Sequence, residues 1–373
     1  MLSSRTRGGI ACAARLPRRA RTLTATYRER TTASGDLKLA YQEWGPDDGP
    51  VILALHGFGV SGHMFDEFGQ RASDRYRLIN LDQRGHGDSE WASDGDYTRE
   101  AFVADVEAVR EGLGFESVIL MGHSMGGLNA VEYTFQHPER VSALILVDVG
   151  PEAAKEGVDN IMRFTRGPDE LDFDEFVQNA MRFNTRRTEE NIRERMRHRL
   201  RPLENGKWTW KFDKRFREGE GAVRSGSELS SDELWRRFRE LAPPVLLLRG
   251  QQSDILSQEV AERTAGEIPA ARLVVVPEAG HSVPGDNPDG FTEAVTAFLD
   301  DVDAGRFPEP EADPAPIPIP DDIDELRRGW RARERRIPGV ALVAGAAVAV
   351  TAVAAAGAFL FSRFRRGRRD DEA

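Results

Sequence analysis

Residues 117–135 read SVILMGHSMGGLNAVEYTF. Four of the first five residues are apolar, as in a buried parallel strand, and the last eight place apolar residues at helical spacing. Between them, GHSMG matches Gly-x-Ser-x-Gly, the pattern of a sharp strand-to-helix turn that exposes a nucleophilic serine. Gly122 and Gly126 suit such a turn, because only small residues tolerate its tight backbone. The stretch predicts a strand, a strained turn at Ser124 and a helix. The alternative is a chance match in a glycine-containing turn, and the flanking elements argue against it.

Short apolar runs predict further buried strands along the chain. They occupy residues 51–55, 77–81, 143–147, 245–249 and 272–276. A hairpin is predicted at 27–45, around the turn signal Ser34-Gly35, and a helix at 99–112. Strands that alternate with helices indicate a mostly parallel sheet with helices on both faces.

The interval 150–242 is too long for a loop and predicts an inserted lid over the strand ends. Apolar residues at helical spacing in DEFVQNAMRF and DELWRRFREL make it mainly helical. Its arginine-rich part, 182–201, indicates contact with an anionic membrane surface or an acidic substrate. The simpler alternative is a solvated helix face that pairs within itself. Trp208, Trp210 and Phe212 line an acyl pocket or, more simply, pack the lid onto the core.

Composition excludes several classes of protein. The net charge of −11 argues against nucleic-acid binding, which needs a basic face. A single cysteine, Cys12, excludes an internal disulfide framework and a cysteine-based metal site.

Both ends of the chain differ in composition from the middle. Residues 1–26 lack acidic side chains and are rich in arginine, which predicts a disordered basic arm or a mitochondrial-type presequence. Residues 303–337 form a Pro-rich and then Arg-rich linker. The uncharged run within 338–362 is long enough for a bilayer core of about 30 Å and predicts a transmembrane helix, followed by a charged tail at 363–373. Arginines flank the helix on both sides, so the positive-inside rule does not settle its orientation. Without a secretory signal, we expect a membrane-anchored protein with its folded domain on the cytoplasmic side.

A serine nucleophile needs a base, and His281 is the candidate because it follows the last predicted strand in PEAGHSVPGDNP. A carboxylate must in turn orient the imidazole. Asp254, after the strand at 245–249, is favoured by chain order, and Asp148, at the end of the strand at 143–147, is the alternative.

Acyl transfer also needs hydrogen-bond donors for the developing oxyanion. The backbone N–H of Met125 follows the nucleophile, and that of Phe58 lies in the glycine-rich turn HGFG directly after a strand. We predict these two amides as the oxyanion hole.

Together, these motifs resemble the α/β-hydrolase fold family over residues 27–302. The resemblance rests on HGFG, DQRGHGDS, GHSMGG, the Ser-Asp pair at 253–254 and GHSVPGDNP. It implies a mostly parallel eight-stranded sheet, a Ser-His-Asp triad of Ser124, His281 and Asp254, and neither metal nor organic cofactor. It also implies that Arg84 and Asp88 hold loops near the pocket. Relatives with haloalkane dehalogenase or epoxide hydrolase activity use an aspartate nucleophile, so Ser124 argues against both.

The expected function is hydrolysis of a carboxylic ester or thioester of an apolar, small or medium-sized substrate. The expected partners are this small molecule and, through the C-terminal helix, membrane lipid; the oligomeric state is left open. A lactone hydrolase or carbon–carbon bond hydrolase on the same triad is the alternative. A non-catalytic ligand-binding receptor is the third hypothesis, against which the complete triad argues.

Overall fold

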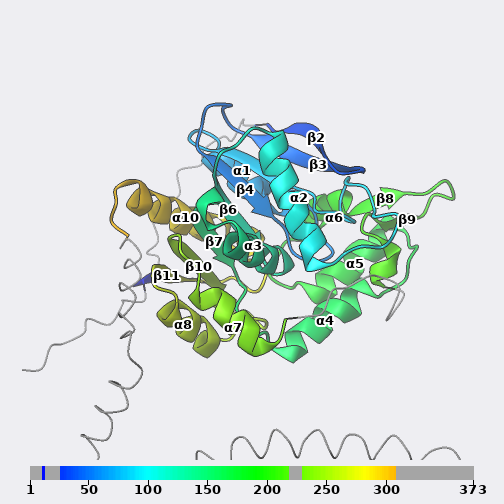
Figure 1. Ribbon diagram of the computed structural model, residues 1–373. Helices are drawn as coiled ribbons and strands as arrows, with labels where there is room; N and C mark the ends of the chain where they lie inside the picture. Colours follow the sequence, from blue (N-terminus) through cyan, green and yellow to red (C-terminus); the bar gives the residue numbers. More distant parts are fainter. Residues whose placement is uncertain (1–10, 13–25, 218–228, 308–373) are drawn as a thin grey trace, which may run out of the picture. The chain divides into compact units, whose positions relative to one another are not determined.

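The computed structural model describes residues 11–12, 26–217 and 229–307 (Figure 1). The linker beyond residue 307, the transmembrane helix predicted at 338–362 and the tail at 363–373 lie outside these ranges and stay predictions. Within the described ranges, no helix is both long and apolar enough to span a membrane.

A mixed sheet forms the centre of the fold, with strand order β1-β11-β10-β7-β6-β4-β5-β3-β2. Strand β3 pairs antiparallel with both of its neighbours, β2 and β5. All other neighbouring strands in the sheet run parallel. Eight strands correspond to the predicted sheet: β2 (Arg28–Ser34), β3 (Leu37–Trp44), β4 (Val51–Leu55), β5 (Arg77–Leu81), β6 (Val118–His123), β7 (Val141–Val147), β10 (Val245–Gly250) and β11 (Ala271–Val276).

A ninth strand, β1 (Ala11–Cys12), lies beside β11. It belongs to the segment 1–26, predicted as a disordered basic arm or a presequence; these two residues form a strand instead, and residues 1–10 and 13–25 of that segment lie outside the described ranges. The physical reason is that β11 would otherwise be an edge strand with unpaired backbone groups, and backbone pairing needs no apolar pattern that a sequence would reveal.

Helices cover both faces of the sheet. On one face lie α2 (Arg99–Gly112), α3 (Met125–Gln136), α7 (Ser231–Arg239) and α8 (Gln258–Glu267), and on the other α1 (Asp66–Ala72) and α10 (Pro288–Asp303). Strand β4 shows why two layers form: Leu53 and Leu55 join the core under α2 and α3, whereas Ile52 and Ala54 join the core under α1 and α10. Side chains alternate along a strand, so an apolar strand is buried on both faces.

The inserted lid consists of α4 (Lys155–Thr165), α5 (Phe173–Phe183), α6 (Glu189–Arg199) and the hairpin of β8 (Leu200–Pro202) and β9 (Trp208–Trp210). Trp210 and Phe212 are buried in the lid's own apolar cluster, and Trp208 packs against it. These aromatic side chains therefore pack within the lid rather than lining the cavity, and, within the described residues, only Phe212 of the three also contacts rings of the body, those of Phe58 and His86.

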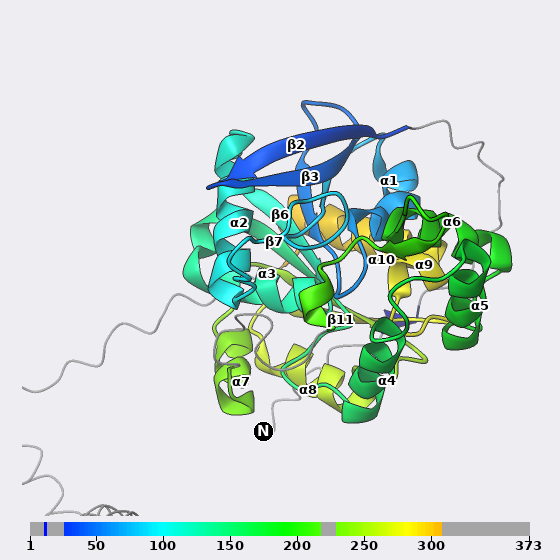
Figure 2. The same cartoon turned by 90° about the vertical axis from the view of Figure 1, so that its right-hand side faces the viewer.

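Helix α7 was expected in the lid, but it packs beside α8 and against α3 (Figure 2). Phe238 of α7 is buried in the core of the sheet. The lid proper therefore ends before α7.

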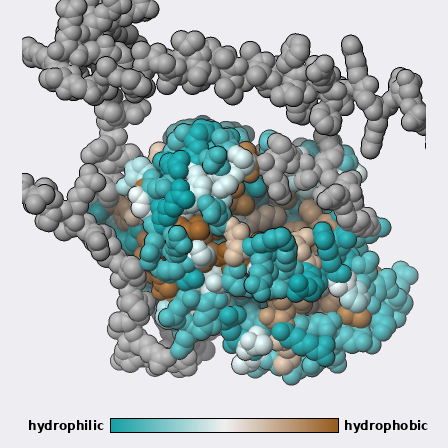
Figure 3. Space-filling view, turned by 90° about the horizontal axis from the view of Figure 1, so that it is seen from below, coloured by the Kyte–Doolittle hydropathy of each residue, from teal (hydrophilic) through white to brown (hydrophobic). Residues whose placement is uncertain are grey.

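Few large apolar side chains of the described residues reach the surface. The face drawn in Figure 3 is mostly hydrophilic, with separate hydrophobic patches. The exposed large apolar residues are Val158 and Phe183, both on lid helices.

Candidate active site

Ser124 lies between the last residue of β6 and the first residue of α3, with φ 51° and ψ −117°. A positive φ is a strained conformation for a residue with a Cβ atom. The surrounding glycines make the turn possible, because a Cβ on Gly122 would lie 2.4 Å from Gly126 O, and one on Gly126 would lie 2.3 Å from Leu55 O. The predicted strand, tight turn and helix are therefore all present, and Ser124 lines a cavity.

His281 follows β11 and lines the same cavity. Its Nδ1 lies 2.8 Å from Oδ2 of Asp148, which is fully buried at the end of β7. That carboxylate also accepts hydrogen bonds from Gly250 N at 2.9 Å and from Ser253 Oγ at 2.5 Å. Two further donors thus hold Asp148 in position for the imidazole.

The favoured acid, Asp254, is not the partner of His281. Its side chain is exposed at the cavity wall and, within the described residues, makes no hydrogen bond or ion pair. Strand β7 lies directly between β6 and β10, so Asp148 leaves the sheet beside the nucleophile. After β10 the chain turns at Ser253, whose hydroxyl donates to Asp148. The side chain of the next residue, Asp254, takes no part in the contact between Asp148 and His281.

His123, beside the nucleophile, supports the loop that carries His281. Its Nε2 lies 2.9 Å from the backbone oxygen of His281, and the two rings are 4.5 Å apart. Burial, and then the neighbouring His281, hold the pKa of His123 well below its ordinary value of 6.5. The neutral ring therefore carries its proton on Nε2 and donates it to that carbonyl. The sequence motifs assigned His123 no part in the site.

The predicted oxyanion loop lies against Ser124. A Cβ on Gly57 would be 3.4 Å from Ser124 Cβ, which places the backbone before Phe58 next to the nucleophile. Met125 is the first residue of α3, and first-turn N–H groups have no partner within their helix. Both amides thus come from elements that border the serine.

His56 and Gln83 hold this loop to the end of β5. Gln83 N donates to His56 Nε2 at 2.9 Å, and the Gln83 amide donates to His56 O at 2.6 Å. Because Nε2 accepts, Nδ1 carries the proton and donates to Gly57 O at 2.7 Å. Burial, followed by the effect of His86, lowers the pKa of His56 well below 6.5, so the ring stays neutral.

The segment DQRGHGDS holds loops, as the resemblance implied. Arg84 forms two hydrogen bonds with Asp105 of α2, at 2.6 and 2.7 Å. Asp82 accepts from Gly62 N and Asp88 N, and the Asp88 side chain pairs with Lys211 of the lid at 2.7 Å.

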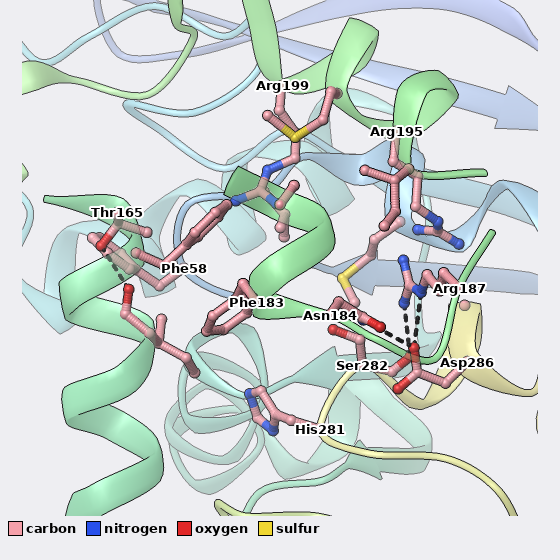
Figure 4. Close-up of a pocket in the computed structure, with 18 of the residues that line it drawn as sticks. Phe58, Thr165, Phe183, Asn184, Arg187, Arg195, Arg199, His281, Ser282 and Asp286 are labelled. Carbon is pink, nitrogen blue, oxygen red and sulfur yellow. Dashed lines mark hydrogen bonds and ion pairs between the residues drawn. The ribbon is translucent and has the colours of Figure 1, made fainter. Parts of the chain in front are cut away.

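Between the lid and the sheet lies a cavity of about 530 Å³ (Figure 4). Apolar side chains, among them Phe58, Met64 and Phe164, form part of its wall. The wall also holds six arginines: Arg163, Arg182, Arg186, Arg187, Arg195 and Arg199. All but Arg163 belong to the arginine-rich part at 182–201, for which the sequence left open an anionic membrane surface, an acidic substrate or a solvated helix face.

Three side chains near the cavity have the atom types of a metal site. Potential ligand atoms of His63, Asp66 and His198 lie within 4.8 Å of one another. However, His63 Nδ1 already bonds Asp66 Oδ2 at 2.8 Å, and the two imidazoles are stacked with centroids 3.7 Å apart. Nitrogen lone pairs lie in the ring planes, so stacked rings do not direct them at one ion.

Comparisons with known proteins agree with this architecture. Residues 50–288 match the model of the alpha/beta hydrolase fold family. The 3-hydroxybutyrate-oligomer hydrolase of Cupriavidus necator is 30% identical over 260 residues, which are 66% of this chain and 87% of the relative. A putative 2-succinyl-6-hydroxy-2,4-cyclohexadiene-1-carboxylate synthase of Bacillus subtilis is 30% identical over 285 residues, 73% of this chain and 98% of the relative. The crystal structure of E-2-(acetamidomethylene)succinate hydrolase is 26% identical, with a TM-score of 0.65, and the match covers 74% of this chain and all of that one. A family match over more than half of the chain, together with the strained serine turn, shows that this protein belongs to the α/β-hydrolase fold family.

Proposed function

We propose that this chain is a serine hydrolase that cleaves a carboxylic ester or thioester, with Ser124 as nucleophile, His281 as base and Asp148 as the orienting acid. The observation that carries the proposal is the contact of His281 with the buried Asp148 at the wall of the cavity that contains the strained Ser124. An apolar wall beside the serine suits the carbon chain of a small or medium-sized ester.

The proposed mechanism begins with the tautomer of His281. Because Nδ1–H donates to Asp148, Nε2 is the basic nitrogen that takes the Ser124 proton as Oγ attacks the ester carbonyl. The N–H groups of Phe58 and Met125 stabilise the oxyanion, and loss of one such donor costs about 2.7–4 kcal/mol in comparable sites. The proton on Nε2 passes to the leaving alcohol or thiol. Water, activated by the same imidazole, then hydrolyses the acyl-enzyme.

A lactone or carbon–carbon bond hydrolase that uses the same three residues is the second candidate. It is favoured by the variety among relatives, one of which, 28% identical, is a 2-(acetamidomethylene)succinate hydrolase of Mesorhizobium japonicum. Turnover of a lactone or a β-diketone in preference to every ester tested would select it.

The test of the proposed nucleophile is labelling with a fluorophosphonate probe, which reacts with activated serines. We expect the wild type to be labelled and Ser124→Ala to remain unlabelled, with both proteins shown to be folded by circular dichroism. A folded wild type that resists the probe and turns over no activated ester would overturn the assignment and favour the ligand-binding receptor.

We also propose, from the sequence, that residues 338–362 anchor the protein in a membrane with the hydrolase domain on the cytoplasmic side. Support comes from the uncharged run and its flanking arginines. The full chain should stay in the membrane pellet after alkaline carbonate extraction, whereas a chain lacking 338–362 should be released. Release of the full chain would contradict the anchor. Protease added to sealed spheroplasts tests on which side of the membrane the hydrolase domain lies. Protection of the domain would support the cytoplasmic side, and its digestion would contradict it.

A further inference from the structure

The cavity wall is strongly basic although the protein as a whole is acidic. Six arginines line it, against two carboxylates, Asp254 and Asp286. The net charge of the chain is −11, so general composition does not account for this concentration of positive charge. The arrangement is therefore a local property of the site.

Two of the six arginines are neutralised by buried or partly buried carboxylates. Arg187 Nε donates to Asp286 at 2.8 Å, with side chains only 9% and 1% exposed. Arg195 donates to both oxygens of Glu67, at 2.6 and 2.7 Å. These pairs fasten the lid to the body of the protein and leave little free charge.

Three others are bonded to neutral amide groups. Arg163 donates to Asn160, Arg182 to Asn179, and Arg186 to Gln252. Within the described residues, none of the three has a carboxylate partner. A pair with an amide leaves the positive charge of the guanidinium uncompensated.

Arg199, at the end of α6, is the arginine most closely tied to the site. Its Nε donates to Gly59 O at 3.0 Å, in the loop that carries Phe58. Its guanidinium lies 5.5 Å from the ring centre of Phe164 and 5.2 Å from that of Trp210. In Figure 4 it enters the cavity from the lid, on the side away from His281. No carboxylate of the described residues bonds it.

The surroundings of the Arg199 guanidinium disfavour its positive charge. Burial, followed by repulsion from Arg187 and Arg195, lowers the pKa of Arg199 to about 9. The group still carries its proton at neutral pH. A charge in a partly buried site without a counterion is costly, and a bound anion would offset that cost.

A purely structural role for Arg199 accounts for only part of its geometry. The bond to Gly59 O uses one of five N–H donors, and a neutral amide side chain would form it equally well. Arg199 lines the cavity, and within the described residues its two Nη atoms make no hydrogen bond. Together they present the fork that matches the two oxygens of a carboxylate.

We propose that the cavity receives a substrate whose non-reacting end carries a carboxylate, and that the Arg199 guanidinium binds this carboxylate. The inference rests on the proposed ester hydrolysis at Ser124 and narrows its substrate class. Arg163, Arg182 and Arg186 add a positive field, and the apolar wall receives the carbon chain between the carboxylate and the scissile ester. The substrate is thus the ester of a hydroxy acid or the half-ester of a dicarboxylic acid.

Two sets of chromogenic esters test the proposal, because the carboxylate can belong to either side of the scissile bond. The first set contains mono-4-nitrophenyl esters of dicarboxylic acids from succinate to suberate, each beside a twin whose far carboxylate is methylated. The second contains straight-chain acyl esters of 4-hydroxybenzoate, each beside the same ester of methyl 4-hydroxybenzoate. Rates are corrected for spontaneous hydrolysis. For the wild type, we expect kcat/KM to favour the carboxylate member roughly 10- to 100-fold in one of the sets, the effect of a charge-assisted hydrogen bond.

The variants isolate Arg199. Arg199→Gln should bring the ratio between the twins close to one, and Arg199→Lys, which keeps the charge but loses the fork, should give an intermediate ratio. The readout is the ratio of the kcat/KM values of the two twins. A displacement of the Phe58 loop that slows the hydrolysis of both twins equally therefore does not change it. Arg197→Gln is the matched control on the same helix, since Arg197 is exposed and pairs with Glu194, and it should keep the wild-type ratio.

The outcomes separate the two proposals. A wild type that is labelled at Ser124 but shows no preference in either set overturns the carboxylate site and leaves the serine hydrolase in place. A preference that survives in Arg199→Gln also overturns it, because another group would then bind the anion. Absence of both labelling and turnover overturns the proposed function and the carboxylate site with it.

Discussion

At the scale of single residues, the position of one carboxylate decides how the site is built. Asp148 is fully buried, has a φ of 50° and accepts hydrogen bonds from Gly250 N, Ser253 Oγ and His281 Nδ1. A carboxylate held by several donors keeps its position and fixes the ring that it contacts. Asp254 has no such partners within the described residues and stands at the rim of the cavity.

Asp148→Asn should therefore lower kcat by about 10³- to 10⁴-fold, because an amide favours the wrong imidazole tautomer. Asp254→Asn, the matched change at the exposed acid, should lower kcat far less. Steady-state kinetics on one activated ester, with circular dichroism to confirm folding, checks both. An equal loss in the two variants would contradict the assignment of Asp148.

At the scale of elements, ion pairs join the lid to the body. Arg195 of α6 pairs with Glu67 of α1, and Lys211 after β9 pairs with Asp88. The Arg195–Glu67 side chains are only 16% and 23% exposed, so the solvent screens this pair less than a surface one. The lid's position thus depends in part on the charge of Arg195, which lies at the cavity wall.

Glu67→Gln leaves Arg195 without its carboxylate beside two other arginines, so we expect destabilisation by about 1–3 kcal/mol and a raised KM. Urea denaturation and steady-state kinetics measure the two effects. Glu190→Gln, an exposed change on α6, is the matched control and should alter neither. Wild-type stability in Glu67→Gln would show that the pair does not hold the lid.

At the scale of the whole molecule, three buried histidines couple folding to pH. Burial is the main cause that lowers the pKa of His56, His86 and His123, in the case of His86 to about 4. The unfolded chain binds protons near pH 6.5 and the folded chain does not, so stability falls as the pH drops below about 6.5. His63 acts in the opposite sense, because its contact with Asp66 outweighs burial and raises its pKa. The stability that His63 contributes is therefore lost as the pH rises through its raised pKa.

Replacing His86 with Gln should flatten the acid side of the stability curve. The wild type should lose up to about 3 kcal/mol through this residue between pH 6.5 and 4, and the variant should not. The measurement is the free energy of unfolding in urea at a series of pH values. Parallel curves for the two proteins would show that His86 is not a source of the acid sensitivity.

The amino-acid sequence by itself determined the strands, the tight turn at Ser124 and the presence of a lid. These features depend on local patterns: apolar runs, helical spacing and glycines whose missing Cβ atoms a turn requires. β4, β5 and α2 occupy the predicted residues, and the remaining core strands agree within two residues.

Only the tertiary structure decided which carboxylate meets His281, where α7 packs and which arginines face inward. Each of these depends on contacts between segments far apart in the chain. Asp148 and Asp254 both follow strands, and the order of those strands in the sheet separates them. Arg197 and Arg199 lie on one helix, yet the first pairs with Glu194 at the surface and the second faces the cavity. The physical reason is that burial and charge pairing are properties of neighbours in space, which a local pattern does not contain.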